Sequence, residues 1–593
     1  MLKTHNIQNG VQCHHQNICG WKRQRTTYQI NQIENEFSIY IQNGRVMQLE
    51  QIPHQLSNNE TDTNLELVKH LTQKREVNQN NGKIGQLMMF WKQQRIKAGG
   101  FYNDNEQKLG RWIELSNNFW EKSQIFIEGQ YEEGKKQGRW NIINLEKKIG
   151  GGNYDENGLK NGKWKEQHNN FYDLCEVYFV GEYKLGQRIG FWNIINRYKQ
   201  MYYDRIIDSG GGIYNENGLK HGKWIETHEY FFNFCQVLYV GQYENGRKYG
   251  RWDTLHLKLG SIQYEVIGGG NYDDFELKNG MWRELHQNFQ EFSVVVYEGL
   301  YQDNLKIGQW QIQYRKYGEE DIEIIGSGYY EEDKKVGVWK EQATNFWDES
   351  LIYHAGEYYK GKKIGKWNII YKNYLIGGGQ YNYEGQKHGN WIDVDENYSL
   401  SKSILYQGVY QNGNKVGIWF TIDDISEGFT QYMALGFYNY EGMKNGRWLD
   451  LVENYRENSQ VMQKGNYKNG IMYGKWNFVY KHHNSLNFHE LGGGQYDENG
   501  KRDGPWLELV DNFQENCQVI LVGEYKNGYK QGKWNALFRP LNEYTYQTLG
   551  GGEYRENGFK NGKWTEIHEN FSNFWRQTNI FEYQNGCKLK QIA

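Results

Sequence analysis

The chain of 593 residues contains only three prolines and six cysteines. So few cysteines over this length do not make the disulfide framework of a small secreted domain. The longest apolar stretch, at 87–91, is far shorter than the roughly 18 residues that a membrane-spanning helix needs. Since the N-terminal residues also lack the apolar core of a secretory signal, we expect a soluble, cytoplasmic protein.

Charge of one sign is also missing, because 69 basic residues stand against 72 acidic ones. This balance removes the attraction on which a dedicated nucleic-acid binder depends, so we expect no nucleic-acid partner. The chain is rich in Gly (70), Trp (22), Tyr (48) and Phe (26), and these aromatics argue against a disordered linker protein. The glycines follow no G-X-Y period, which excludes collagen. The abundance of Asn, Gln, Lys, Ile and Tyr suggests a unicellular eukaryote.

Two motifs alternate along the chain, and each ends in a Trp. In type A, exemplified by residues 150–164, the Trp stands at 112, 164, 224, 282, 339, 391, 448, 506 and 564. In type B, exemplified by residues 181–192, it stands at 140, 192, 252, 310, 367, 419, 476 and 534. The distance from A to B is 28 residues in all eight cases, whereas the distance from B to A varies from 24 to 32. A constant distance indicates a packed connection and a variable one indicates a surface loop.

Each motif has the pattern of a β-hairpin. Gly stands two residues before the Trp in all 17 motifs, and Lys or Arg stands four before it in 16, with Met472 as the exception. An aromatic-led run, a Gly-containing turn and a second such run are typical of a hairpin. We therefore predict an all-β fold, an elongated antiparallel array of about 17 hairpins over residues 81–593. Its last unit is truncated as a cap, and neighbouring hairpins stabilise one another.

The pattern Gly-x-Tyr-x-x-Gly-x-Lys-x-Gly-x-Trp, as in residues 181–192 and 523–534, resembles the MORN repeat. It is especially similar to the YwqK-type, antitoxin-like variant, in which Asn-Gly-x-x-x-Gly-x-Trp ends each unit. The connection that follows the type A Trp is longer than in the short family repeat. The resemblance implies a scaffold for proteins or membranes, and it supplies no catalytic residue.

Residues 1–80 form a separate N-terminal region. The runs 37–41 and 46–49 predict one hairpin, and the capping pattern at 63–66, followed by Val68 and Leu71, predicts a short amphipathic helix. Cys13 and Cys19, with two His between them, are a zinc-binding alternative. Since no second Cys pair completes that set, we expect no metal and no other cofactor.

A basic side chain recurs at one turn position and defines a candidate basic stripe. If all turns emerge on one edge, the stripe would meet an anionic membrane or an acidic partner. The alternative is that these side chains are solvated and keep the edge from aggregating. The stripe comprises Lys108, Lys136, Lys160, Arg188, Lys220, Lys248, Lys278, Lys306, Lys335, Lys363, Lys387, Lys415, Lys444, Arg502, Lys530 and Lys560.

An acid stands two residues after every type A Trp and defines a candidate acidic row. By strand alternation these acids share the Trp face. They would serve a basic partner or, as we favour, a cross-strand bond to a Lys or an indole. One carboxylate per repeat cannot build a calcium cage of six to eight oxygens. The row comprises Glu114, Glu166, Glu226, Glu284, Glu341, Asp393, Asp450, Glu508 and Glu566.

Other recurrent residues have structural interpretations. The triple glycines, as at 150–152, lead into further hairpins instead of a phosphate-binding helix, so they leave space for a ring or allow a bulge. Cys175, Cys235 and Cys517 exchange with Ser at the same repeat position, which indicates a small, half-buried site.

No cluster of His, Ser or Cys interrupts the repeats, so we expect no enzymatic activity. The leading hypothesis is a non-enzymatic scaffold for protein partners, cytoplasmic and associated with the cytoskeleton. One alternative is binding to anionic membranes through the basic stripe. A second is binding of a small ligand or carbohydrate between Trp rings.

Overall fold

A computed structural model provides the three-dimensional view of this chain. It describes residues 2–16, 20–33, 37–42, 45–51, 64, 67, 70–77, 85–92, 94–200, 203–287, 289–344, 346–396, 398–399, 402–425, 429–452, 455, 459–482, 485, 487–541, 543–556, 558–568, 571–584 and 586–591. Cys19 and most of the predicted helix lie outside these residues, and so does the side chain of Cys13.

The described residues form 42 strands, and they fall into two sheets. The first sheet has the order β1-β2-β3-β4 and contains β1 (Leu2–Gln16), β2 (Gly20–Ile33), β3 (Phe37–Gln42) and β4 (Arg45–Gln51). Strands β3 and β4 pair where one hairpin was predicted, whereas β1 and β2 were not anticipated. Leu71, which we expected in a helix, begins β5.

The second sheet is the repeat array, in which each strand pairs antiparallel with the next. This confirms the predicted all-β meander. Its strands are β5 (Leu71–Val77), β6 (Gly85–Trp91), β7 (Gln94–Tyr102), β8 (Lys108–Leu115), β9 (Ile125–Glu132), β10 (Lys135–Asn144), β11 (Lys147–Tyr154), β12 (Lys160–Gln167), β13 (Val177–Lys184), β14 (Gln187–Gln200), β15 (Tyr203–Tyr214), β16 (Lys220–Thr227), β17 (Val237–Glu244), β18 (Arg247–Leu257), β19 (Tyr264–Tyr272), β20 (Lys278–Leu285), β21 (Val294–Gln302), β22 (Leu305–Arg315), β23 (Glu323–Glu331), β24 (Lys334–Gln342), β25 (Ile352–Tyr359), β26 (Lys362–Tyr371), β27 (Tyr374–Tyr381), β28 (Lys387–Val394), β29 (Ile404–Gln411), β30 (Asn414–Ile425), β31 (Phe429–Tyr438), β32 (Lys444–Leu451), β33 (Gln460–Lys468), β34 (Ile471–Lys481), β35 (His489–Tyr496), β36 (Arg502–Leu509), β37 (Gln518–Lys526), β38 (Tyr529–Arg539), β39 (Gln547–Tyr554), β40 (Lys560–Ile567), β41 (Thr578–Gln584) and β42 (Cys587–Gln591).

The core of the array is an unbroken stack of aromatic rings on one face of the sheet, which we call the aromatic ladder. It alternates the 17 repeat Trp with 18 Tyr, from Tyr102 to Tyr583, through edge-to-face contacts with ring centroids 4.8 to 6.5 Å apart. Every one of these Trp is at most 7% exposed. Each indole N–H donates to a backbone carbonyl of a neighbouring strand at 2.9 to 3.3 Å, so the buried donor is satisfied.

Two kinds of glycine make this packing possible. Gly299 lies flat under the indole of Trp310, and an added Cβ there would overlap the ring. The same relation recurs under all 17 repeat Trp and explains the third residue of each Gly triplet. Gly308, two residues before Trp310 at a β-bulge within β22, adopts a φ of 66° in open space. That backbone conformation, which glycine adopts at no steric cost, accounts for the glycine two residues before each Trp.

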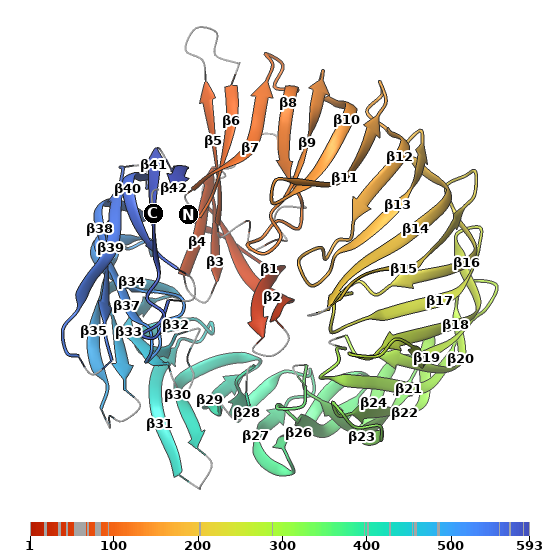
Figure 1. Ribbon diagram of the computed structural model, residues 1–593. Helices are drawn as coiled ribbons and strands as arrows, with labels where there is room; N and C mark the ends of the chain where they lie inside the picture. Colours follow the sequence, from red (N-terminus) through yellow and green to blue (C-terminus); the bar gives the residue numbers. More distant parts are fainter. Residues whose placement is uncertain are drawn as a thin grey trace.

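The array curves until its two ends meet (Figure 1). The ring of Phe559, in the turn before β40, stacks on Phe90 of β6 with centroids 4.3 Å apart, and the Lys74 Nζ lies 4.0 Å from the Phe559 ring centroid. The Arg95 N–H of β7 donates to the Gly586 carbonyl at 2.9 Å. Phe559 is therefore 5% exposed, whereas Leu159, at the same turn position of another unit, is 41% exposed.

We expect Gly299→Ala to destabilise its hairpin strongly, because the Trp310 indole must move to admit a Cβ. Gly308→Ala should cost about 1–2 kcal/mol through its left-handed backbone alone. Hydrogen exchange of the β21 and β22 amides measures both effects, with the exposed Gln309→Ala as control. Unchanged exchange in Gly299→Ala would contradict the packing described here.

Phe559→Ala should loosen the junction between the two ends, since removing a buried Phe side chain costs about 3–5 kcal/mol. We expect a larger radius of gyration in small-angle X-ray scattering. Leu159→Ala is the matched control and should leave the scattering curve unchanged. If both variants scatter like the wild type, Phe559 does not hold the ends together.

Candidate functional site

The basic stripe and the acidic row are two halves of one structural feature, which we call the charged ladder. Every one of the 16 bases lies within ion-pair distance of an acid of the row. Seven of the nine acids pair with two bases, one from a type A motif and one from a type B motif. These bases lie at the beginning of strands and not in the turns where we predicted them. The cross-strand bond that we favoured for the acids is present in seven units, to a Lys in six and to Arg188 in one. In all nine units the type A base lies on the same strand as its acid, six residues before it.

Glu341 illustrates the geometry of a unit. Lys335 of the same hairpin and Lys363 of the next one both pair with its carboxylate, the latter at 2.9 Å. The hydroxyl of Tyr358 in the aromatic ladder donates to the same group at 3.1 Å. A Tyr hydroxyl plays this part in all nine units. The acid is thus saturated with donors and 12% exposed.

The bases also cover the aromatic rings. The Lys335 Nζ lies 4.4 Å from the Trp339 ring centroid, and the Lys363 Nζ lies 3.9 Å from that of Trp367. Such cation–π contacts are worth about 0.5–2 kcal/mol, depending on how far the cation is desolvated. The ladder bases are 14 to 32% exposed, so each is shared between an acid, a ring and solvent.

Burial and charge oppose each other in setting the pKa values of the charged ladder. Burial raises the pKa of the Glu341 carboxyl, but the charges of Lys335 and Lys363 outweigh it and hold that pKa below its ordinary value. Glu114, Glu226 and Glu284 behave alike. Burial lowers the pKa of Lys363 despite the charge of Glu341.

Two acids pair with a single base, Glu566 in the last unit and Asp450 in the unit that contains Met472. Met472, which replaces the type B base, is 1% exposed and sits within the aromatic core. Its acid, Asp450, keeps the ion pair with Lys444 at 2.6 Å and the Tyr467 hydroxyl at 3.1 Å. The substitution shows that a unit keeps its geometry with one base.

Three other predicted features can be placed. Cys175, Cys235 and Cys517 are at most 1% exposed, more deeply buried than predicted, and are not part of a disulfide. Ser293, at the same repeat position, donates to the Phe346 carbonyl of the next unit at 2.6 Å.

Within the part of the chain that the structure describes, no group of three or more His, Cys, Asp or Glu is arranged to hold a metal ion. No helix among those residues is long and apolar enough to cross a bilayer.

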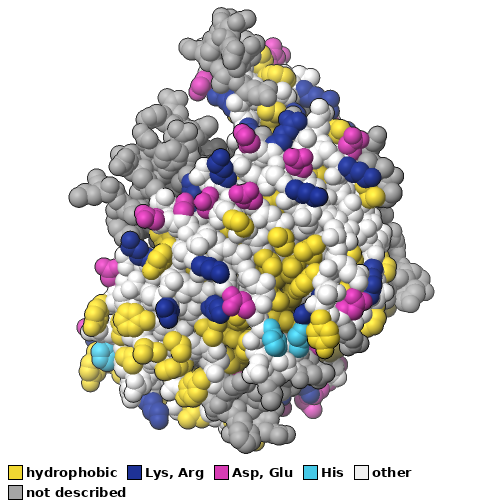
Figure 2. All heavy atoms as spheres, turned by 90° about the vertical axis from the view of Figure 1, so that its left-hand side faces the viewer, with side chains coloured by type: hydrophobic (Ala, Val, Ile, Leu, Met, Phe, Trp, Pro, Cys, Tyr) yellow, Lys and Arg dark blue, Asp and Glu magenta, His cyan; other side chains and the backbone are white. Residues whose placement is uncertain are grey.

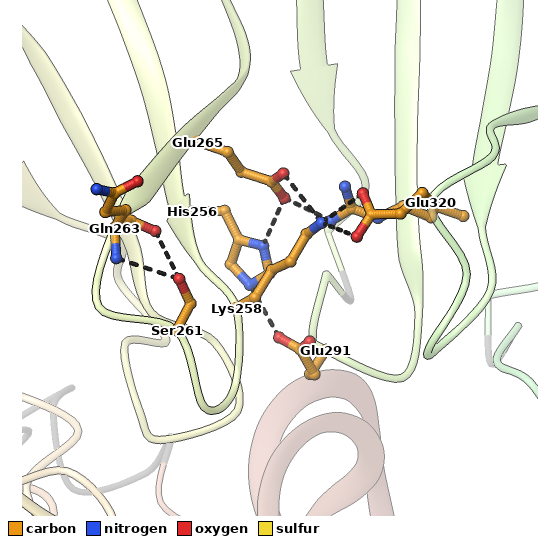
Figure 3. A network of polar contacts seen from close by, with 8 residues as sticks. His256, Lys258, Ser261, Gln263, Glu265, Glu291 and Glu320 are labelled. Carbon is orange, nitrogen blue, oxygen red and sulfur yellow. Dashed lines mark hydrogen bonds and ion pairs between the residues drawn. The ribbon is translucent and has the colours of Figure 1, made fainter.

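A polar network centred on His256 interrupts the regular packing (Figure 3). Its Nε2 lies 3.2 Å from a Glu291 oxygen and its Nδ1 lies 3.6 Å from a Glu265 oxygen. Arg315 and Lys258 pair with Glu265 at 2.6 and 3.3 Å. His256 is completely buried and joins neighbouring units through this network, whereas the side chains of Lys258 and Glu265 are 27% and 31% exposed.

The face opposite the aromatic ladder is exposed and irregular. Its central row is formed by the residue before each Trp and the residue before each Tyr, which pair across strands. Most pairs are polar, as Lys163 with Glu182 or Lys366 with Gln380. Three are apolar: Phe191 with Ile213, Met281 with Leu300, and Ile418 with Phe437. Figure 2 shows one side of the molecule, where hydrophobic side chains gather in patches between scattered charges.

The sequence analysis missed this exposed row because it considered only the residues that recur in every repeat. The signal was available, since the positions one before each Trp and one before each Tyr are variable and can be read from the chain. Which apolar positions lie together, however, depends on the pairing register.

No known protein family matches the chain. No curated protein matches its sequence either.

We expect Glu341→Gln to lower the free energy of unfolding at pH 7 by about 1–3 kcal/mol, because two cations would face a neutral amide. The folded-state pKa of Glu341 lies below the ordinary 4.5, so its stabilisation is present above that pH and is lost as pH falls through the folded pKa. The difference between variant and wild type should therefore shrink in denaturant unfolding between pH 7 and pH 3. Lys363→Met, which copies the Met472 unit, is the control and should cost less. A difference that grows on acidification would contradict this pairing.

Proposed function

We propose that this chain is a non-enzymatic repeat scaffold of the MORN type that binds protein partners through its exposed face. The observation that carries the proposal is the contrast between the two faces. The aromatic and charged ladders repeat in nearly every unit, whereas the exposed row changes from pair to pair. A curved array with a variable face is a common means by which repeat proteins recognise other proteins.

Protein binding is favoured over the two alternatives by the state of the recurrent residues. The bases that would meet an anionic membrane are all engaged with acids, as Lys363 is with Glu341. The Trp rings that would stack on a sugar or a choline are at most 7% exposed. Both alternatives require groups that the fold already uses. A cytoplasmic scaffold of the cytoskeleton is the setting we propose.

Detergent fractionation of cells expressing the tagged full-length chain tests the proposal. We expect the protein to stay in the detergent-insoluble pellet. A variant in which the three exposed apolar pairs become Lys with Gln should lose this retention. Phe101→Gln, a single change on the same face, is the control. Release of the wild type by detergent, together with salt-sensitive flotation on vesicles of anionic lipid, would replace the proposal with membrane binding.

A further inference from the structure

An apolar patch interrupts the exposed face over strands β28 to β31. Val409, Ile418 and Phe437 lie on successive strands and are 39%, 56% and 43% exposed. Leu435, one step along β31, is 54% exposed, and Tyr432 is 62% exposed. Val409 thus extends the pair of Ile418 and Phe437 onto a third strand, so the apolar surface spans three adjacent strands.

The patch is hollowed. Val409, Ile418, Phe420 and Tyr432 line a depression of about 520 Å³ together with polar atoms of Asn390 and Gln407. The Phe420 and Tyr432 rings meet edge-to-face with centroids 5.4 Å apart, which gives the depression a rigid wall. A large apolar side chain from a partner would fit such a hollow, as anchor residues do at the centre of an interface.

Basic residues flank the patch on both sides. In the same row, Lys366 stands before it on β26, and Arg447 and Lys475 follow it on β32 and β34. Their partners on the following strands, Gln380, Asn466 and Gln495, are uncharged. On the strand before Lys366, the row position is occupied by Glu357 of β25. The nearby Glu490 is paired with Lys464 at 3.0 Å. A second copy related by a twofold axis would bring these bases together, which disfavours self-association.

The strand pairing of the sheet limits which secondary structure a partner can have. Strands β28 to β31 each pair with a neighbour on both sides, so no strand edge is open for an added strand. A partner must lie on the face, where only a helix satisfies its own backbone groups. Six strand spacings separate Lys366 from Arg447, about 29 Å at 4.8 Å per strand. A helix of about 19 residues has that length.

We propose that this patch docks an amphipathic helix of another protein, with apolar anchors in its middle and acidic residues at both ends. The inference rests on the proposed function, since it gives the scaffold one defined binding site. The apolar anchors fill the hollow at Ile418 and Phe420. The acidic ends approach Lys366 on one side and Arg447 on the other.

Fluorescence anisotropy with synthetic 19-residue helical peptides tests this proposal. The probe carries Leu and Phe anchors at helical spacing and three Glu at each end, and a second peptide replaces every Glu by Lys. We expect the Glu-ended probe to bind the full-length chain at least tenfold more tightly than the Lys-ended one. Equal binding of both peptides, or binding of neither, would overturn the proposal.

Matched variants locate the site. Ile418→Lys with Phe437→Gln converts the central pair into a copy of Lys366 with Gln380, so the fold should tolerate it. We expect this variant to weaken binding at least tenfold, and Lys366→Glu with Arg447→Glu to do the same. Phe191→Lys with Ile213→Gln, at another exposed apolar pair, should leave binding unchanged. If Phe191→Lys with Ile213→Gln weakens peptide binding equally, the peptide does not bind at this patch.

Two other measurements distinguish helix binding from self-association and from a binding site elsewhere on the scaffold. Sedimentation should find the same mass for the wild type and for the Ile418→Lys, Phe437→Gln variant. A wild-type dimer that this variant dissociates would assign the patch to self-association and overturn the proposal. The Glu-ended peptide could fail to bind while the variant with all three apolar pairs replaced still loses retention in the detergent-insoluble pellet. In that case the scaffold function stands and the assignment of this binding site does not.

Discussion

The fold depends on the contact between each Trp ring and the bare backbone of a glycine on the adjacent strand. With no Cβ in the way, the indole of Trp310 lies against Gly299 and reaches a carbonyl of the same strand. The neighbouring Tyr rings then close the gaps between indoles. Each edge-to-face contact adds about 0.5–1.5 kcal/mol beyond burial, and none of these hairpins would be stable alone. Each Trp and the glycine beneath it lie 11 or 12 residues apart in the same hairpin, so this packing tolerates the variable distance from B to A.

The charged ladder is a consequence of the same stack. A flat row of buried rings needs a cover on its open side, and a Lys stem with its ammonium over the indole supplies one. Cations placed so closely would repel one another, and the acid two residues after each type A Trp relieves that repulsion. Seven acids serve two bases each, so these units retain one excess positive charge, and the unit with Met472 has none. The conspicuous charges of the sequence are therefore part of the packing.

Sequence reasoning reached the hairpins and the Lys–Glu pairing because both follow from local spacing. Gly308 and Trp310, two residues apart, belong to the second strand of one hairpin, and strand alternation puts Glu341 on the face of Trp339. It did not reach the meeting of the two ends, since curvature accumulates from a small rotation at each of many hairpins. In the sequence, Phe559 occupies the same turn position as Leu159, and nothing local distinguishes the two. Only the contact with the first strands of the array buries Phe559. Strands β1 and β2 were also missed, because they lack the aromatic–glycine signature of the repeats.

The two faces of the array obey different constraints, and this difference bears on function. On the covered face a change at one position disturbs the rings before and after it, so the units remain alike. On the exposed face Lys366 and Ile418 occupy equivalent positions with no such coupling, and a change there alters the surface without altering the fold. An exposed apolar residue gains only about 0.2–1 kcal/mol from a cross-strand pair such as Ile418 with Phe437, and burial against a partner would give it further stabilisation. At Ile418, Phe437 and Val409 three such residues lie side by side within a margin of basic residues, and a partner with an apolar centre and acidic ends would supply it.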